Sequence, residues 1–328
     1  MQEGECVVSG QKEMKPAGVA ELPKQAGDVR FRWGWTEPSV WTTRMLAALE
    51  SGVEGCTWFS LIDKVFSLDN LRSSFQLVKR NRGGSGTDGV SIAQFESNLE
   101  ANLQRLSFEL KTGTYEPSLI KRCYIPKGGG KELRPLGIPT IRDRVVQGAL
   151  RNVLEPIFEA EFTANSYGFR PGRGCKDALR EVDGLLRTGY RFVVDLDIKR
   201  YFDSIPHTPL MVRIREKVSD GRVLQLVEKY LQQGILDGLE EWTPETGTPQ
   251  GAVISPLLSN IYLHPLDLQM RQNGFHMVRY ADDQVVLCKT REEAESALDL
   301  VREWMSSAGL TLHPVKTRLV DMAERGGF

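Results

Sequence analysis

The sequence has 328 residues, of which 41% are hydrophobic and 26% are charged, and its formal net charge at pH 7 is −1. This length and composition predict a globular chain that can bury a sizeable core and divide into two subdomains. The near-zero charge argues against a uniformly basic nucleic-acid binder, although one positive face is enough to bind phosphate. With no apolar run of about 18 residues and no secretory signal pattern, we expect no membrane partner and a cytoplasmic location.

Residues 1–58 are expected to form a leader that is partly disordered, because residues 1–35 are polar and lack hydrophobic periodicity. Within it, Trp33 and Trp35 could dock on the rest of the chain. From Asn70 onward, apolar residues recur at helical spacing and end at a glycine-rich turn over residues 83–89. Ser91 and Gln94 then predict a capping box for one helix that continues to Gly113.

A hairpin is predicted next, from strands at 121–125 and 131–136 joined by three glycines, followed by a helix from Thr140. Residues 121–151 contain eight basic and two acidic residues. A run of charge is usually a solvated helix face, but these charges flank a glycine turn, so phosphate binding is an equal alternative. The five cysteines are scattered and the four histidines show no ligand spacing, which disfavours disulfides and zinc.

Further helices are predicted at residues 176–187, from the Thr208-Pro209 pair, at 219–233, at 257–266 and from Thr290 to Gly309. The apolar, β-branched composition of residues 190–198 predicts a buried strand, which Asp195 and Asp197 interrupt. Strands at 277–280 and 284–288 are separated only by residues 281–283, which must therefore form a tight hairpin turn. Helices and strands mix without strict alternation, so we predict an α+β fold with antiparallel strands.

The acidic residues at the ends of these strands are the candidate catalytic residues. An isolated pair such as Asp282-Asp283 is most often an ordinary turn, because aspartate favours turns. If the strand end with Asp195 and Asp197 lies beside it, like charges gather and need a cation. Carboxylates with no nearby His or Cys suit magnesium, and two ions roughly 3.5–4 Å apart can activate a 3′ hydroxyl and stabilise a leaving pyrophosphate.

Six motifs, in order, resemble those of reverse transcriptases encoded by bacterial group II introns. They lie at residues 133–144, 166–174, 197–203, 247–260, 280–283 and 313–317. The resemblance spans about residues 60–320 and implies the fingers and palm of a right-hand polymerase, with an antiparallel palm sheet and packed helices. Residues 59–189 would form the fingers with some palm elements, and residues 190–328 the palm with the catalytic site.

The resemblance also implies roles for individual residues. Asp197, Asp282 and Asp283 would be the catalytic carboxylates that bind two Mg²⁺ ions, with the Ile198 backbone near the metal and the triphosphate. The nucleotide-binding residues would be Lys127, Arg134, Ile198, Phe202, Gln250 and Lys316. The residues in contact with nucleic acid would be Arg142, Arg144 and Arg170.

Phe202 matches the family position of the bulky side chain beneath the sugar of the incoming nucleotide. An aromatic ring there leaves no space for a 2′ hydroxyl, which favours DNA synthesis over an RNA-dependent RNA polymerase of the same palm class. The alternative interpretation of Phe202 is an ordinary core phenylalanine.

The implied activity is RNA-directed DNA polymerisation, with an RNA template, a DNA or RNA primer and dNTPs as partners, and with group II intron RNA bound by the full-length protein. A second hypothesis is an RNA-binding splicing cofactor, a maturase, whose polymerase activity is lost. The chain departs from the family pattern at Ala252, where many relatives have glycine, and it stops at Phe328, where the family continues into a thumb. We therefore expect the thumb to be missing. The intron concerned and the oligomeric state stay undetermined by the sequence.

Overall fold

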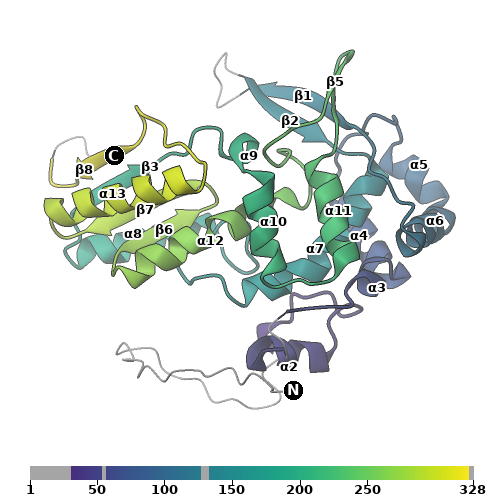
Figure 1. The fold of residues 1–328 in the computed structure, drawn as a ribbon, viewed down its shortest axis with the longest axis horizontal. Coiled ribbons are helices and arrows are strands. Elements are labelled where there is room, and N and C mark those ends of the chain that lie inside the picture. Colours follow the sequence, from purple (N-terminus) through teal and green to yellow (C-terminus); the bar gives the residue numbers. More distant parts are fainter. Residues whose placement is uncertain (1–30, 54–56, 127–132, 325–328) are drawn as a thin grey trace, which may run out of the picture.

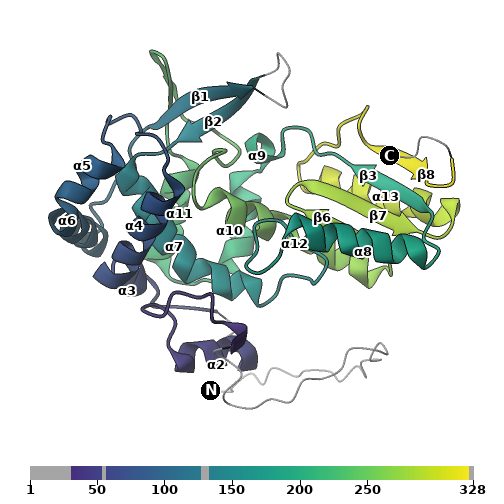
Figure 2. The same cartoon turned by 180° about the vertical axis from the view of Figure 1, so that it is seen from behind.

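The computed structural model describes residues 31–53, 57–126 and 133–324. It is elongated, with a four-stranded sheet and its helices at one end and a largely helical region at the other (Figure 1). Seen from both sides, a second sheet rises from the helical region as a projecting hairpin (Figure 2). Lys127, one of the expected nucleotide-binding residues, lies outside the described residues.

The N-terminal part of the described chain is packed against the helical region. Helix α2 (Thr43–Ser51) begins after Thr42, whose side chain accepts a hydrogen bond from the Met45 N–H. Trp41 is fully buried, and its indole Nε1 donates to the Asn152 carbonyl at 2.9 Å. Trp33 is also buried, whereas Trp35 is partly exposed. The expected docking of Trp33 is therefore confirmed.

Helices α3 (Ile62–Val65) and α4 (Leu68–Asn81) follow, and α4 packs along α7 (Ile141–Glu159). The predicted capping box of Ser91 and Gln94 is confirmed, but the single helix expected after it is two helices, α5 (Ile92–Ser97) and α6 (Leu99–Thr112). The break falls at Asn98, whose backbone leaves the helical region with φ −126° and ψ 38°. The Asn102 side chain donates to the Phe95 carbonyl at 2.9 Å, so a carbonyl of the interrupted helix keeps a partner.

The N-terminal sheet has the strand order β2-β1-β4-β5. Strands β1 (Ile120–Pro126) and β2 (Leu133–Ile138) form the predicted antiparallel hairpin, and β1 also pairs in parallel with β4 (Ile235–Asp237). Strand β5 (Glu240–Trp242) completes the sheet beside β4. The hairpin of β4 and β5 was not predicted, because three-residue strands are too short to show a period of two.

The C-terminal sheet has the order β6-β7-β3-β8, and each neighbouring pair is antiparallel, as predicted. Its strands are β3 (Phe192–Leu196), β6 (His276–Tyr280), β7 (Asp283–Cys288) and β8 (Arg318–Asp321). Helix α8 (Cys175–Arg187) covers one face, with Val193 and Leu287 beneath it (Figure 2). Helices α12 (Ser255–Gln272) and α13 (Arg291–Ser307) lie on the other face, against Val194 and Val286 (Figure 1). The alternation of residues 193 and 194 between the two faces is that of a strand buried on both sides.

Three helices connect the two ends of the molecule: α9 (Tyr201–Ser204), α10 (His207–Arg215) and α11 (Gly221–Leu231). The prediction that Thr208 caps α10 is wrong, because the helix begins at His207 and Pro206 occupies the N-cap. Proline at 206 presets the extended backbone that leads into the helix. Helix α11 is capped instead by the Asp220 carboxylate, which accepts from the Arg222 and Val223 N–H groups.

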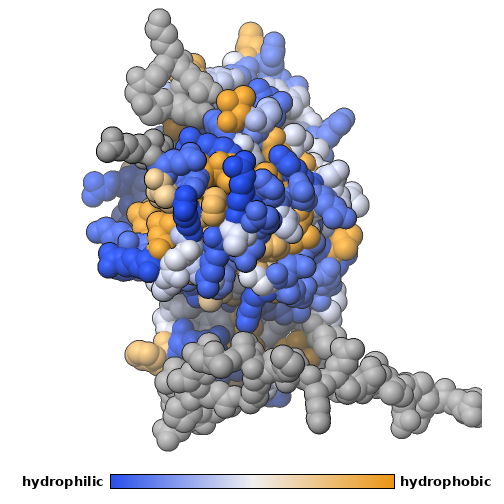
Figure 3. Space-filling model, turned by 90° about the vertical axis from the view of Figure 1, so that its left-hand side faces the viewer, coloured by the Kyte–Doolittle hydropathy of each residue, from blue (hydrophilic) through white to orange (hydrophobic). Residues whose placement is uncertain are grey.

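The surface over the C-terminal sheet is mainly hydrophilic, with apolar residues in small separate patches (Figure 3). Exposed large apolar side chains in this part of the chain include Leu179 and Val315. Across the described residues, each helix is too short or too polar to span a lipid bilayer.

Candidate active site

The register of the C-terminal sheet brings the two acidic strand ends together. Strands β3 and β7 are antiparallel neighbours, and Leu196 pairs with Gln284. One step further along the same register, Asp197 leaves β3 opposite Asp283, the first residue of β7. The strand order thus places the two acidic strand ends side by side. This is the arrangement that the sequence required for a cluster of negative charge.

A tight turn presents the second aspartate of the hairpin. Tyr280 pairs with Asp283, so only Ala281 and Asp282 form the turn, and Ala281 has the left-handed φ of 59°. Burial raises the pKa of Asp282, and the charge of Asp197 adds to the rise. Burial likewise raises the pKa of Asp283, together with the charges of Asp282, Asp197 and Asp195. The neighbouring carboxylates therefore make ionisation of Asp282 and Asp283 less favourable.

Basic side chains from the segment after α13 oppose part of this negative charge. Lys316 Nζ lies 3.0 Å from Asp197 Oδ2, and Arg318 Nε lies 3.4 Å from Asp195 Oδ2. The Asp197 backbone is fixed as well, because its carbonyl accepts from the His313 N–H at 2.7 Å. Ile198 is buried and forms an antiparallel bridge with Leu312. Lys316, one of the expected nucleotide-binding residues, therefore lies against the acidic strand end.

The donor chemistry at this edge suits a hard divalent cation. Asp197, Asp282 and Asp283 offer only oxygen, and the pKa values of Asp282 and Asp283 are raised by burial first and by the neighbouring negative charges second. Within residues 31–53, 57–126 and 133–324, however, no group of three or more His, Cys, Asp and Glu side chains is placed to hold a metal ion. One oxygen of Asp197 is already engaged by Lys316. The three carboxylates thus lie in one region and carry the same charge, but in the described residues they are not arranged as a complete set of metal ligands.

The projecting hairpin contributes positive charge to the same region. Arg134 is exposed on β2, opposite Ile125 of β1, and its charge lowers the pKa values of both Asp282 and Asp283 against the dominant effect of burial. This electrostatic effect places the arginine within interaction range of the acidic turn, although residues 134 and 282 are far apart in sequence.

The loop that carries Gln250 is docked against β2. The Gln250 carbonyl accepts from the Gly137 N–H at 2.6 Å. Gly251 has φ 103°, and a Cβ at this position would lie 2.4 Å from the Gly137 carbonyl oxygen, so only glycine fits. The Thr248 N–H donates to the Phe202 carbonyl at 2.7 Å, which joins the same loop to α9. Gln250 is therefore held between the hairpin and the helix that carries Phe202.

Phe202 is partly buried in a small aromatic group. Its ring centroid lies 5.5 Å from Tyr201 and 6.4 Å from Phe169, in edge-to-face geometry with both. Phe169 is exposed and has φ 60°, an unusual backbone conformation for a bulky residue. Phe202 thus has one side in the protein and one neighbour at the surface, rather than a fully enclosed core position.

The three arginines expected to contact nucleic acid are bound within the protein. Arg170 is buried, pairs with Glu159 at 2.7 Å, and donates to the Thr163 and Ser166 carbonyls at 2.5 and 2.6 Å. Arg144 is buried as well, with Nε donating to the Pro139 carbonyl at 2.9 Å. Arg142 pairs with Glu109 at 2.6 Å and lies over the Tyr115 ring. All three side chains thus have partners within the protein, and Arg142 alone keeps substantial exposure. Their contact with nucleic acid stays a prediction.

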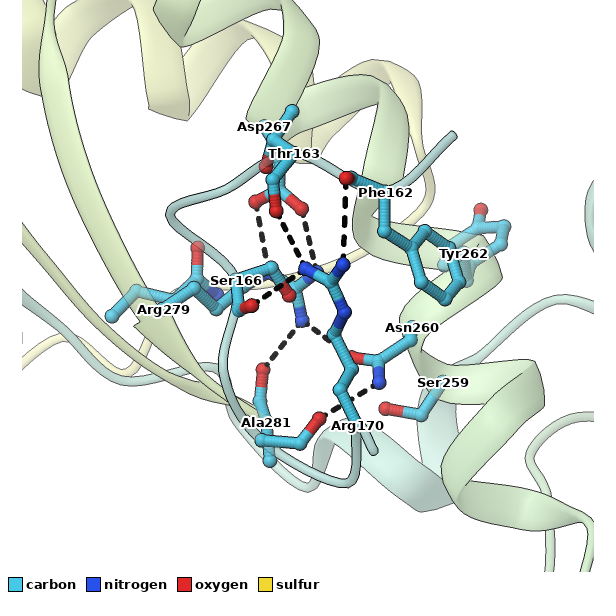
Figure 4. Close-up of polar contacts among 12 residues, drawn as sticks. Phe162, Thr163, Ser166, Arg170, Ser259, Asn260, Tyr262, Asp267, Arg279 and Ala281 are labelled. Atoms are coloured by element: carbon cyan, nitrogen blue, oxygen red, sulfur yellow. Dashed lines mark hydrogen bonds and ion pairs between the residues drawn. The ribbon is translucent and has the colours of Figure 1, made fainter. Parts of the chain in front are cut away.

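Arg279 was not among the residues predicted from the sequence; it lies in β6, two residues before Ala281 of the acidic turn. It is fully buried and pairs with Asp267 of α12 (Figure 4). The signal was present in the sequence, because an arginine between Val278 and Tyr280 interrupts an otherwise apolar strand, as Asp195 interrupts β3. A charged residue in a buried strand requires a partner.

A family model described as "Reverse transcriptase (RNA-dependent DNA polymerase)" matches residues 125–325. Protein YkfC of Escherichia coli (strain K12) is 38% identical over 245 residues, which cover 73% of this chain and 60% of that protein. Group II intron-encoded protein LtrA of Lactococcus lactis subsp. cremoris is 41% identical over 194 residues, which cover 59% of this chain and 32% of LtrA. The chain thus spans less than two thirds of the length of either relative.

Among solved structures, apo telomerase from Candida tropicalis, truncated from its C-terminal domain, resembles this chain with a TM-score of 0.50 at 13% identity. The likeness covers 69% of this chain and 56% of the telomerase chain. At this level of identity it shows a shared fold and nothing further about the chemistry.

Proposed function

Because this chain belongs to the reverse transcriptase (RNA-dependent DNA polymerase) family, we propose that it copies an RNA template into DNA. The observation that carries the proposal is the meeting of two acidic strand ends, with Asp197 directly after β3, Asp283 at the start of β7 and Asp282 in the turn. The positive charge of Arg134 acts on the same acids. An acidic edge faced by a basic hairpin suits a substrate that carries both a triphosphate and a metal ion.

Asp197, Asp282 and Asp283, with the Ile198 carbonyl, would hold two Mg²⁺ ions. When bound, these ions would supply Lewis-acid stabilisation of the charge on the transferring phosphoryl group. The chain's own contribution is to keep three carboxylates at one sheet edge, where burial and the neighbouring negative charges raise the pKa values of Asp282 and Asp283. Lys316 balances the charge of Asp197 in the structure described.

The incoming nucleotide would lie between the hairpin and the acidic edge. Arg134, with Lys127 nearby in the sequence, would bind the triphosphate through charge-assisted hydrogen bonds. Gln250 would lie against the nucleotide or its base pair, since its loop is held between β2 and α9. Phe202 would exclude a 2′ hydroxyl, and its one-sided aromatic packing is consistent with a ring that faces a substrate. The partners of this reaction are an RNA template, a DNA or RNA primer and dNTPs.

A second candidate function is binding of group II intron RNA as a splicing cofactor. It is favoured by the similarity to LtrA, a group II intron-encoded protein. We place both functions in the cytoplasm. We also retain the division proposed from the sequence, with a leader at residues 1–58, fingers at 59–189 and palm at 190–328. The pairing of β4 with β1 means that the sheet of the fingers takes two strands from the palm portion of the chain.

Primer extension on an RNA template tests the proposal, with dNTPs and rNTPs compared side by side. We expect DNA synthesis that Asp282→Asn reduces by several orders of magnitude, because an essential carboxylate charge is lost. Asp299→Asn is the matched control, since Asp299 is an exposed helical aspartate with a side chain 76% exposed. Near-normal extension by Asp282→Asn would refute the assignment. Loss of extension with unchanged binding of intron RNA in the same variant would separate the polymerase from the splicing function.

A further inference from the structure

We infer that Arg279 is a positioning residue for the catalytic carboxylates: it fixes the turn at Ala281 and thereby sets the direction in which Asp282 and Asp283 leave the sheet. The inference rests on the proposed function, because it assigns the geometry of the same site to a side chain that touches neither substrate nor metal. It also gives a role to two conspicuous sequence features, the arginine inside β6 and the Tyr167-Gly168 pair.

Arg279 contacts the turn from the protein interior, where its side chain is fully buried. Its Nε and one terminal nitrogen donate to the two oxygens of Asp267 at 2.8 and 2.6 Å. The other terminal nitrogen donates to Asn260 Oδ1 at 2.8 Å and to the Ala281 carbonyl at 3.0 Å (Figure 4). Asn260 and Asp267 are seven residues apart on α12, so they occupy one face of the helix and hold the guanidinium from the same side.

The Ala281 carbonyl is the point at which this network meets the active site. Ala281 adopts φ 59°, a conformation that side chains other than glycine rarely occupy. A residue keeps such a conformation only when its surroundings determine it. The hydrogen bond from Arg279 orients the peptide that follows Ala281, and that peptide carries Asp282. A change in this peptide plane would therefore redirect the Asp282 carboxylate.

Gly168 makes a second contact with the turn. A Cβ on Gly168 would lie 2.1 Å from the Ala281 nitrogen and 2.8 Å from the Tyr280 carbonyl carbon, so Gly168 lies directly against the turn backbone. Asn260 Nδ2 donates to the Gly168 carbonyl at 2.9 Å, and the Tyr167 N–H donates to the Arg279 carbonyl at 2.8 Å. Asn260 thus connects the residue that orients the turn with the residue that packs on it.

Stability alone does not explain a buried ion pair at this position. The Arg279 and Asp267 side chains are exposed by only 0% and 3%, and apolar residues of similar volume often stabilise a core as well or better. What apolar residues lack is a rigid donor directed at one carbonyl oxygen. The planar guanidinium is held by Asp267 through two bonds, and this leaves its remaining terminal nitrogen aimed at Asn260 and Ala281.

The first test compares two buried asparagines that make the same kinds of bond. Asn260 and Asn70 are 1% and 0% exposed, and each side chain donates to a backbone carbonyl and accepts from another side chain. Asn70 joins α4 to α7, away from the acidic turn. We expect Asn260→Ala to lower kcat for nucleotide addition by about 10- to 100-fold with a KM for dNTP changed less than about threefold. Asn70→Ala should lower the melting temperature to a similar degree while kcat below the transition stays within about threefold of wild type. An equal loss of kcat in both variants would overturn the inference.

The second test does not require polymerase activity. Amide hydrogen exchange of residues 280–284 should speed up at least about tenfold in Arg279→Lys, because the compact ammonium cannot replace the fork that joins Asp267 to Ala281. Exchange in α4, at the far end of the molecule, should stay as in wild type. Unchanged exchange at the turn, or a uniform increase across the chain, would contradict a positioning role. If the wild-type chain proves inactive, the proposed function fails in primer extension, while the exchange comparison still decides whether Arg279 orders the turn.

Discussion

Asp220 offers a sharp test of how the N-terminal segment is attached to the helical region. Asp220 is 8% exposed, and its carboxylate accepts four backbone N–H groups. Oδ2 accepts from Leu61 and Ile62 at 2.6 and 2.9 Å, and Oδ1 accepts from Arg222 and Val223 at 3.0 and 3.2 Å. One side chain therefore caps α11 and anchors the start of α3, which lies about 160 residues earlier in the sequence.

Two substitutions separate these contributions. Asp220→Ala leaves the cap and two poorly solvated N–H groups without an acceptor, which should cost about 4 kcal/mol. Asp220→Asn keeps one acceptor oxygen for the cap, since asparagine caps nearly as well as aspartate, but its amide faces the Leu61 and Ile62 N–H groups, so we expect about 2 kcal/mol. For a chain of 328 residues, unfolding entropy of about 0.7 kcal/mol/K translates these losses into about 6 °C and 3 °C of melting temperature.

The same carboxylate predicts a pH dependence. Burial alone would raise the pKa of Asp220, but hydrogen bonds from Ile62, Leu61, Val223 and Arg222 outweigh it and lower the pKa below its ordinary value. The stabilisation is thus fully present above the unfolded-state pKa of about 3.9 and is lost as the pH falls through the lower folded-state pKa. Thermal melts followed by circular dichroism should show a constant gap between wild type and Asp220→Asn from pH 7 to pH 5, narrowing below about pH 4. Equal melting temperatures for wild type and Asp220→Ala at pH 7 would refute this account.

Three further predictions concern other parts of the molecule. Phe202→Ala should raise ribonucleotide insertion relative to deoxynucleotide insertion by about 10- to 1000-fold in single-nucleotide assays, and an unchanged ratio in an active variant would assign the ring to packing alone. Arg134→Ala should raise the KM for dNTP by about tenfold or more, since one charge-assisted contact is lost, whereas Arg105→Ala, which removes an exposed helical arginine, should not alter it. Trp41→Phe should destabilise the chain by about 2 kcal/mol in urea unfolding, because the Asn152 carbonyl loses its donor; a change below about 0.5 kcal/mol would contradict that role.

The local elements of this protein were predictable because their signals lie within a few residues of one another. The capping box at Ser91, the Thr140 cap of α7 and the Thr290 cap of α13 are all confirmed. The turn between β6 and β7 followed from two apolar strands separated by three residues. Where a local signal was ambiguous, prediction failed by small amounts, as at Asn98, which divides one expected helix, and at His207, where α10 begins before the expected cap.

The sequence by itself determined where the acidic residues lie relative to the strands. Asp197 lies at the end of one buried strand, and Asp282-Asp283 lie between two others. Only the tertiary structure decided that β3 lies between β7 and β8, which sets Asp197 opposite Asp283 and brings Lys316 to it. It also decided that Arg144 and Arg170 turn inward and that Arg279 meets Asp267. The physical reason is that hydrophobic period and capping are local, whereas strand order and the partner of a buried charge depend on which distant segments share a core.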